Sequence, residues 1–155
     1  MQILYYFAYG SNMNTERVAE RGLHTGTVQG GVLPDYRLTF NKSSRDHPGY
    51  GHADIEYAPT ERVEGVLYEL VDEQQILKMD PFERAPWNYG RDVVRVHTSS
   101  GPIWAWTYFA NSAVKRPGLT PPEAYLKHLL AGREWLSEAY FQHLLQWREG
   151  AAEQQ

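Results

Sequence analysis

The segment from Tyr9 to Met13 places a glycine and two small polar residues where an apolar run ends. Gly10 lets the backbone turn at low steric cost. Successive N–H groups in such a turn, at a helix N-terminus, form an anion-binding nest suited to a carboxylate or a developing oxyanion. The same residues are also consistent with an ordinary strand-to-helix turn capped by an asparagine. The segment has neither the Gly-Lys-Ser/Thr of a Walker motif nor the glycine spacing of a dinucleotide-binding motif.

Two carboxyl groups, Asp80 and Glu83, lie three residues apart in a loop rich in aromatic residues. Burial beside an aromatic ring would raise the pKa of a carboxyl group toward the range useful for a general base. The candidate rings are those of Phe82, Trp87 and Tyr89. Arg84 would lower the pKa if its guanidinium paired with Glu83. The alternative interpretation is a solvated acidic loop that follows a helix.

The histidines and the serine of the first segment do not match known metal or nucleophile motifs. None of the six histidines pairs at the spacing of a helical metal site, and no HExxH sequence occurs. His47 and His52 share one loop, but the sequence indicates no third ligand. The chain has no cysteine, which excludes thiolate chemistry. Ser11 lacks the Gly-x-Ser-x-Gly surroundings of a nucleophilic serine. We therefore expect no metal and no cofactor.

Length and composition indicate one globular domain. The chain has 155 residues, with 42% hydrophobic and 22% charged residues and a net charge of −4. This balance argues against non-specific binding to nucleic acid or to an anionic membrane. The first residues have no signal-peptide pattern, and no apolar run approaches the ~18 residues of a membrane-spanning helix. We expect a cytoplasmic domain over residues 1–150 with a frayed tail at 151–155; the sequence leaves a homodimer open.

The periodicity predicts a mainly β body, two short inserted helices and a helical C-terminus. Strands are expected over residues 3–9 (buried on both faces), 36–40, 53–57, 63–70, 91–98 and 102–110, with an extended, bulged stretch at 25–33. The last two of these strands are expected to form a hairpin joined at Ser99–Gly101. Helices are expected over 14–20, capped by Asn12 or Asn14, and over 72–79, capped by Asp72. Two C-terminal helices are expected to start at the caps Thr120 and Ser137 and to end at Gly132 and Gly150.

These motifs, taken in order, resemble those of the γ-glutamylcyclotransferases. Segment 7–13 resembles the family's glycine-serine-asparagine loop. Segment 79–83, Met-Asp-Pro-Phe-Glu, resembles the Leu-Asp-x-x-Glu segment that carries the catalytic glutamate. Segment 120–125, Thr-Pro-Pro-Glu-Ala-Tyr, resembles the Ser/Thr-Pro-x-x-Tyr start of the C-terminal helix. Segments 35–41, 51–55, 63–68 and 104–108 resemble strands of the family, so the resemblance spans roughly residues 3–147.

The resemblance implies a mixed α/β (α+β) fold, a strongly twisted, partly closed β-barrel with flanking short helices and a helical C-terminus. It also implies that an L-γ-glutamyl amide cyclises to 5-oxoproline and releases an amine. Because the substrate's own α-amino group attacks, no enzyme nucleophile, metal or cofactor is needed. By this resemblance Glu83 is the general acid/base. The substrate-binding residues would be Tyr9, Gly10, Ser11, Asn12, Met13, Asn14, Tyr89 and Tyr125.

Three residues depart from the family pattern around the catalytic glutamate. Arg84 stands where the family usually has glycine, Pro81 lies between the two acids, and Trp87 occupies the following loop. The leaving group therefore stays open among amino acids, amines and isopeptide-linked groups. One alternative is a non-catalytic protein that binds glutamate-like carboxylates. Another is a hydrolase that uses Ser11 as its nucleophile.

Overall fold

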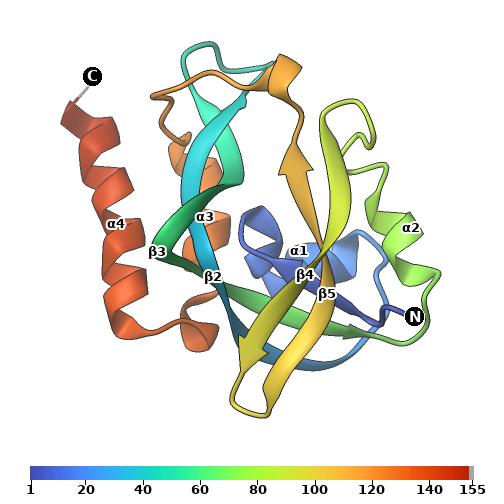
Figure 1. Ribbon diagram of the computed structural model, residues 1–155. Helices are drawn as coiled ribbons and strands as arrows, with labels where there is room; N and C mark the ends of the chain where they lie inside the picture. Colours follow the sequence, from blue (N-terminus) through green and yellow to red (C-terminus); the bar gives the residue numbers. More distant parts are fainter. Residues whose placement is uncertain (154–155) are drawn as a thin grey trace.

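The chain forms a closed five-stranded β-barrel flanked by short helices (Figure 1). The computed structural model describes residues 1–153, and the side chains of residues 1–148. The strands are β1 (Tyr5–Ala8), β2 (Thr25–Ser43), β3 (Gly51–Leu70), β4 (Tyr89–Thr98) and β5 (Gly101–Ala110), in the barrel order β1-β3-β2-β4-β5. A parallel pairing of β1 with β5 at Tyr6 and Trp106 completes the circle. The expected barrel architecture is confirmed.

Strands β2 and β3 are much longer than the sequence pattern indicated. Residues 25–33 and 36–40 belong to one strand, and so do residues 53–57 and 63–70. The breaks in the pattern correspond to bends: the pairing register shifts near Pro34, where Asp35 and Thr60 both have positive φ angles. The Asp35 carboxylate accepts a hydrogen bond from the Thr60 backbone N–H (3.1 Å). Bulges of this kind bend a strand without ending it.

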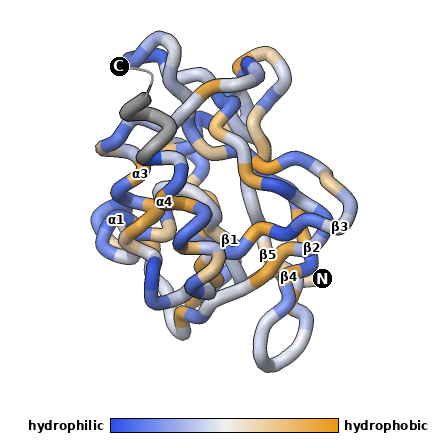
Figure 2. Tube along the Cα trace, turned by 90° about the vertical axis from the view of Figure 1, so that its left-hand side faces the viewer, coloured by the Kyte–Doolittle hydropathy of each residue, from blue (hydrophilic) through white to orange (hydrophobic). Residues whose placement is uncertain are grey.

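The first strand lies in the barrel core. Tyr6, Phe7 and Ala8 are all buried, as expected for a strand covered on both faces. Gly65 on β3 makes room for this strand, because a Cβ there would lie 2.9 Å from the Phe7 ring. Figure 2 shows hydrophobic segments along the strands and in the C-terminal helices, with hydrophilic residues between them. The position of this first core strand thus follows from local sequence.

Within residues 1–153, four α-helices flank the barrel: α1 (Thr15–Glu20), α2 (Gln75–Met79), α3 (Glu123–Leu130) and α4 (Glu138–Glu153). Three short 3-10 turns accompany them, η1 (Ser11–Met13), η2 (Ser112–Val114) and η3 (Arg133–Trp135). In Figure 1, α3 and α4 lie on one side of the barrel and α2 on the opposite side. In the described part of the chain, no helix is long and apolar enough to cross a membrane.

Two helix starts differ from the sequence prediction. Helix α3 begins at Glu123 after Pro122, and Thr120 is not its cap. The Thr120 carbonyl instead accepts a hydrogen bond from the Gly51 N–H (2.9 Å), which ties this segment to the start of β3. Helix α2 begins at Gln75, because the Asp72 carboxylate accepts the Gln74 N–H (2.9 Å) within the preceding turn.

The other two helix caps match the prediction at their N-termini. Asn14 caps α1 by accepting the Glu16 N–H (3.1 Å). Ser137 caps α4, since its hydroxyl accepts the Tyr140 N–H (3.2 Å). The predicted end of α4 at Gly150 is wrong, because the helix continues to Glu153. Of the tail expected at 151–155, residues 154–155 lie outside the described residues.

Candidate active site

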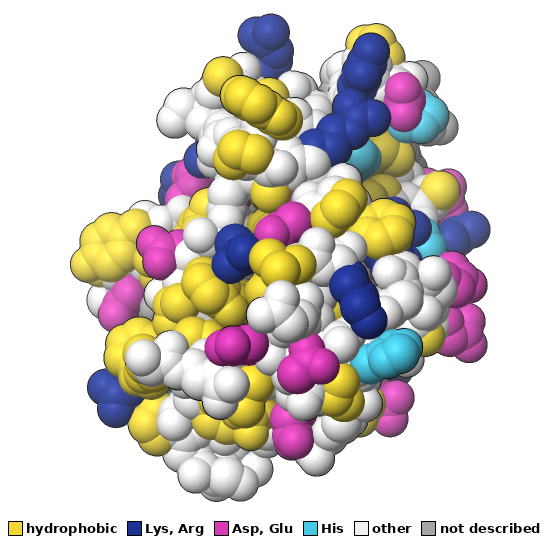
Figure 3. Space-filling model, turned by 90° about the vertical axis from the view of Figure 1, so that its right-hand side faces the viewer, with side chains coloured by type: hydrophobic (Ala, Val, Ile, Leu, Met, Phe, Trp, Pro, Cys, Tyr) yellow, Lys and Arg dark blue, Asp and Glu magenta, His cyan; other side chains and the backbone are white. Residues whose placement is uncertain are grey.

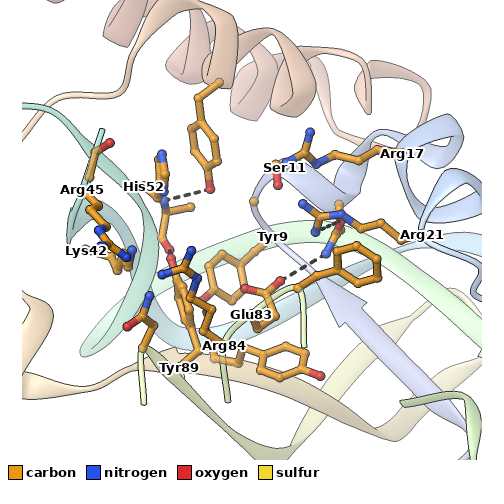
Figure 4. A pocket seen from close by; sticks show the side chains of 18 of the residues that line it. Tyr9, Ser11, Arg17, Arg21, Lys42, Arg45, His52, Glu83, Arg84 and Tyr89 are labelled. Atoms are coloured by element: carbon orange, nitrogen blue, oxygen red, sulfur yellow. Dashed lines mark hydrogen bonds between the residues drawn. The ribbon is translucent and has the colours of Figure 1, made fainter. Parts of the chain in front are cut away.

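A cavity of about 270 Å³ opens where several segments distant in sequence meet (Figure 4). One wall consists of residues 9–12, at the end of β1 and in η1, with cationic side chains from α1 and the residue after it. The opposite wall is the end of β2, the loop after it and the start of β3. The loop over residues 80–88 and one tyrosine of α3 complete the cavity. The glycine turn and the acidic loop, singled out from sequence, therefore meet in space.

Gly10 is required by close contact rather than by an unusual φ angle. Its φ is −112°, but an added Cβ would lie 3.0 Å from the Ala53 Cβ and 3.1 Å from the Tyr125 hydroxyl. That hydroxyl accepts the Ala53 N–H (3.0 Å), while Tyr89 donates to the Ala53 carbonyl (2.8 Å). Two of the three tyrosines expected at the site, Tyr89 and Tyr125, therefore line the cavity and are anchored on one residue of β3. Burial raises the pKa of Tyr125 to about 12, so its hydroxyl stays protonated at neutral pH.

Asn12 is buried and its side chain is fully used by protein partners. Its amide nitrogen donates to the Tyr6 hydroxyl (2.9 Å) and to Glu83 Oε1 (3.2 Å). Its amide oxygen accepts a hydrogen bond from Arg21 (3.0 Å), and its carbonyl accepts one from the Tyr68 hydroxyl (2.6 Å). The structure therefore gives the Asn12 side chain the role of holding Glu83 in place.

The loop that carries Glu83 is fixed to the barrel through Asp80. The Asp80 carboxylate accepts hydrogen bonds from Arg91 Nε on β4 (2.9 Å) and from the Tyr108 hydroxyl on β5 (2.6 Å). The Glu83 N–H donates to the carbonyls of Met79 (3.3 Å) and Asp80 (3.2 Å), which continues the turn after α2. The two acids of this loop thus differ: Asp80 is engaged by barrel residues, and Glu83 lines the cavity.

The environment of Glu83 makes its carboxyl group a weaker acid than that of an ordinary glutamate. Burial raises the pKa of Glu83 to about 6, and Asp80 adds to the increase. Arg21, Arg17 and Lys42 act in the opposite direction but do not cancel the effect of burial. A group with this pKa is deprotonated at neutral pH and is still able to be reprotonated during a reaction.

The aromatic residues of the same loop contribute less to this burial than the sequence suggested. Phe82 is 50% exposed and Trp87 is 79% exposed, whereas Tyr89 is buried. Figure 3, viewed from the side of α2, shows hydrophobic side chains gathered on this face of the molecule. Phe82 nevertheless lines the cavity, and the Arg21 guanidinium lies 4.9 Å from its ring centroid.

The remaining residues predicted for the site divide into two groups. Tyr9 and Ser11 line the cavity, and the Tyr9 hydroxyl donates to the Tyr108 carbonyl (2.5 Å). Met13 and Asn14 do not line it: Met13 is completely buried in the core, and Asn14 caps α1 and contacts His128 (3.0 Å).

Neither a serine nucleophile nor a metal site is supported within the described residues. No hydrogen bond there joins the Ser11 hydroxyl to a histidine or a carboxylate. No group of three His, Cys, Asp or Glu side chains in that part of the chain is placed to hold a metal ion. His52 instead stacks on the Tyr125 ring (4.4 Å between centroids), and burial lowers the pKa of His52 to about 4.

The feature that sequence reasoning missed is the positive charge of the cavity. Five cationic side chains line it, against two carboxylates; the cations are Arg17, Arg21, Lys42, Arg45 and Arg84, and the carboxylates are Asp46 and Glu83. Figure 4 places Arg17 and Arg21 on one side of Glu83, and Lys42 and Arg45 on the other. No spacing in the sequence groups these residues, because they come from three separate regions of the chain.

Arg84 adopts a backbone conformation that favours glycine. Its φ is +48°, in the left-handed region, where a side chain costs about 1–2 kcal/mol. The surrounding turn enforces this conformation, since the Arg84 carbonyl accepts the N–H groups of Trp87 (2.8 Å) and Asn88 (2.9 Å). The Arg84 position, where the resemblance leads one to expect glycine, therefore has the backbone of a glycine and the side chain of an arginine.

Comparison with known families assigns the chain to a family. The family model described as gamma-glutamyl cyclotransferase, AIG2-like, matches residues 6–136, which include every cavity-lining residue from Tyr9 to Tyr125. The chain belongs to this family. No curated protein matches the sequence.

Solved structures support the same assignment for this γ-glutamyl cyclotransferase family member. A structure named gamma-glutamyl cyclotransferase is 25% identical, with a TM-score of 0.75, and the match covers 91% of this chain and 85% of that one. An uncharacterized protein from Homo sapiens is 26% identical, with a TM-score of 0.78 and coverage of 93% and 87%. YkqA from Bacillus subtilis shares the fold at 24% identity and a TM-score of 0.80; the match covers 92% of this chain and 53% of YkqA. The family and the neighbour named gamma-glutamyl cyclotransferase together support a γ-glutamyl cyclotransferase-like activity.

Proposed function

We propose that this protein cyclises an L-γ-glutamyl amide to 5-oxoproline and releases an amine, with Glu83 as general acid/base. The observation that carries the proposal is the state of Glu83. Its carboxyl group lines the cavity, is held by Asn12 (3.2 Å) and has a pKa raised to about 6 by burial. Membership of the γ-glutamyl cyclotransferase family adds support from an independent direction.

In this reaction the substrate supplies its own nucleophile. Glu83 removes a proton from the substrate's α-ammonium group, and the freed amine attacks the γ-carbonyl carbon. A C–N bond forms to close the five-membered ring, and the amide C–N bond to the leaving amine then breaks. Glu83 returns this proton to the departing nitrogen. The ring nitrogen loses a second proton after the attack, and the released amine takes it up and departs as an ammonium ion, so atoms and charge balance. A pKa of about 6 suits both proton transfers near neutral pH.

The glycine turn supplies the second requirement, stabilisation of the oxyanion that develops on the γ-carbonyl. Ser11 and Asn12 open the turn η1, and the first N–H groups of a helical turn have no acceptor within it. We assign these N–H groups to the substrate oxygens and the ring and hydroxyl of Tyr125 to the glutamyl moiety. Fixed donors of this kind act on the transition state without reorganising.

The test is a mass-spectrometric assay for 5-oxoproline with wild-type protein and Glu83→Gln. The substrates are γ-glutamyl amino acids, γ-glutamyl amines and glutathione. We expect product from the wild type and a loss of at least ~100-fold in the variant, the usual contribution of a positioned acid/base. A Ser11→Ala variant, which keeps the backbone N–H, should retain activity. Full activity in Glu83→Gln would refute the role of Glu83.

The alternative, a protein that binds glutamate-like carboxylates without catalysis, makes a different prediction. It requires saturable binding of such carboxylates by wild-type protein and no 5-oxoproline from any γ-glutamyl compound. Calorimetric titration with glutamate alongside the product assay distinguishes the two functions.

A further inference from the structure

Among the described residues, none of the cavity's five cationic side chains forms an ion pair, and three of them also form no side-chain hydrogen bond. Lys42, Arg45 and Arg84 line the cavity, and none of them forms an ion pair with a carboxylate there. Asp46, the other carboxylate of the lining besides Glu83, is exposed and likewise forms no ion pair there. By contrast, Arg21 already donates to Asn12.

Lys42 is the most informative of the three. Its side chain is only 7% exposed, and its ammonium nitrogen lies 6.0 Å from the centroid of the Tyr89 ring. A buried ammonium group without a carboxylate is costly, and such groups are normally paired. Burial and repulsion from the nearby Arg84 guanidinium lower the pKa of Lys42, whereas Glu83 and Asp46 act in the opposite direction without cancelling the decrease. An anion placed between Lys42 and Arg84 would relieve both penalties.

Arg84 adds an independent observation. Its left-handed backbone, with φ of +48°, would be relieved by glycine, and yet a long cationic side chain is present and lines the cavity. Strained residues of this kind persist where the surroundings enforce them and concentrate at ligand-binding sites. Figure 4 shows the Arg84 side chain extending toward the wall that carries Lys42 and Arg45, away from Arg17 and Arg21.

The position of these cations relative to Glu83 indicates which part of the substrate they meet. The glycine turn and Arg21 occupy one side of Glu83, where the proposed function places the glutamyl moiety. Lys42, Arg45 and Arg84 occupy the other side, which is left for the leaving amine. An amino acid with a neutral side chain brings one carboxylate to this side, and one cation is enough to satisfy it. A dicarboxylic amino acid brings a second carboxylate for the remaining cations.

On the basis of the proposed function, we infer that Lys42, Arg45 and Arg84 form a subsite for an anionic leaving amine, and that the preferred substrate is a γ-glutamyl derivative of a dicarboxylic amino acid. The cavity is cationic although the whole chain carries a net charge of −4. Local potentials of this kind attract ligands of the opposite charge into a cleft.

The test compares γ-glutamyl-glutamate, γ-glutamyl-glutamine and γ-glutamyl-lysine, which differ mainly in the charge of the leaving group. We expect wild-type kcat/KM to be at least about tenfold higher for the glutamate compound than for the glutamine compound, the effect of one charge-assisted hydrogen bond. The lysine compound should be the poorest substrate. Added salt should reduce the preference, because Arg45 and Arg84 are exposed.

Variants then assign the preference to the subsite. Arg84→Gln and Lys42→Met should each bring the ratio of kcat/KM between the glutamate and glutamine compounds close to one, and this ratio is the readout because both residues line the cavity. Arg84→Lys, which restores the charge, should recover part of the ratio. Arg95→Gln is the matched control, because Arg95 is exposed on β4 and does not line the cavity. The ratio in that variant should equal the wild-type ratio.

The outcomes separate this inference from the proposed function. Equal kcat/KM for the glutamate and glutamine compounds in the wild type would overturn the anionic subsite and leave the cyclotransferase function standing. A preference that survives in both Arg84→Gln and Lys42→Met would also overturn it. If wild-type protein forms 5-oxoproline from none of the three compounds or of the wider panel, the proposed function fails, and the inference fails with it.

Discussion

Replacement of Glu83 by glutamine should stabilise the folded protein above neutral pH. The pKa of Glu83 is raised from its ordinary value of 4.5 to about 6, so the folded protein binds this proton more tightly than the unfolded chain does. The contribution of this group to stability is therefore complete below pH 4.5 and is lost as the pH rises through about 6. A difference of about 1.5 pKa units corresponds to about 2 kcal/mol at 1.36 kcal/mol per unit.

Glutamine has no ionisable carboxyl group, so the variant avoids the free-energy cost of a buried carboxylate above about pH 6. It also keeps the local contact, because its amide oxygen can still accept the hydrogen bond from Asn12. The assay is urea-induced unfolding of wild type and Glu83→Gln at about pH 8 and about pH 4.5. We expect the variant to gain about 2 kcal/mol at the higher pH, a rise of about 4–8 °C in Tm, and to gain much less at the lower pH.

The control for this prediction is Glu73→Gln, because Glu73 is exposed and does not line the cavity. Its unfolding free energy should stay within about 0.5 kcal/mol of wild type at both pH values. A Glu83→Gln variant that is less stable than wild type at pH 8, or whose stability difference does not change with pH, would refute the reasoning that burial raises the pKa of Glu83.

Three further predictions test the site. The kcat/KM for 5-oxoproline formation should fall about tenfold per pH unit below about pH 6, where Glu83 becomes protonated, and a flat pH–rate profile there would contradict a general base with that pKa. Gly10→Ala should lose about 1–3 kcal/mol in urea unfolding and most of its turnover, because its Cβ would lie 3.1 Å from the Tyr125 hydroxyl; wild-type stability would show that the turn can move. Asp80→Asn should lower the free energy of unfolding by about 1–3 kcal/mol, because it weakens the hydrogen-bonded ion pair with Arg91. The same substitution in an Arg91→Met background should cost much less, and an equal cost in both backgrounds would contradict the coupling.

Strands with a clear local pattern were predictable from the sequence, and long bent strands were not. The continuous apolar run around Phe7 and the alternating pattern of the 91–98 and 102–110 hairpin both matched the structure. The bends in β2 and β3 occur at Asp35 and Thr60, where polar residues interrupt the pattern in the middle of a strand. A local pattern cannot distinguish a bulge that bends a strand from a loop that ends one, because that depends on whether the partner strand keeps its register.

The roles of the two acids depended on tertiary contacts. Asp80 and Glu83 lie in the same loop, and either could have been the buried acid from the sequence alone. Asp80 is engaged by Arg91 and Tyr108, which reach it because the β4–β5 pairing sets their positions. Glu83 is then left to face Asn12. The family resemblance pointed to Glu83, and the contacts explain why the loop presents this acid, and not Asp80, to the cavity.

The charge of the cavity is a property of the fold that composition conceals. The chain has 15 basic and 19 acidic residues, and its net charge of −4 alone would favour a cationic ligand over an anionic one. Inside the cavity the balance of charge is the opposite, because the barrel brings together cations from residues 17–21, 42–45 and 84. Three acidic residues elsewhere are paired: Asp54 and Glu56 with Lys115, and Asp80 with Arg91. Because a cleft focuses the field of the charges that line it, we expect the charge of the ligand to follow from these cations and not from the isoelectric point. The proposed activity and the proposed subsite together predict that this acidic protein selects an acidic leaving group.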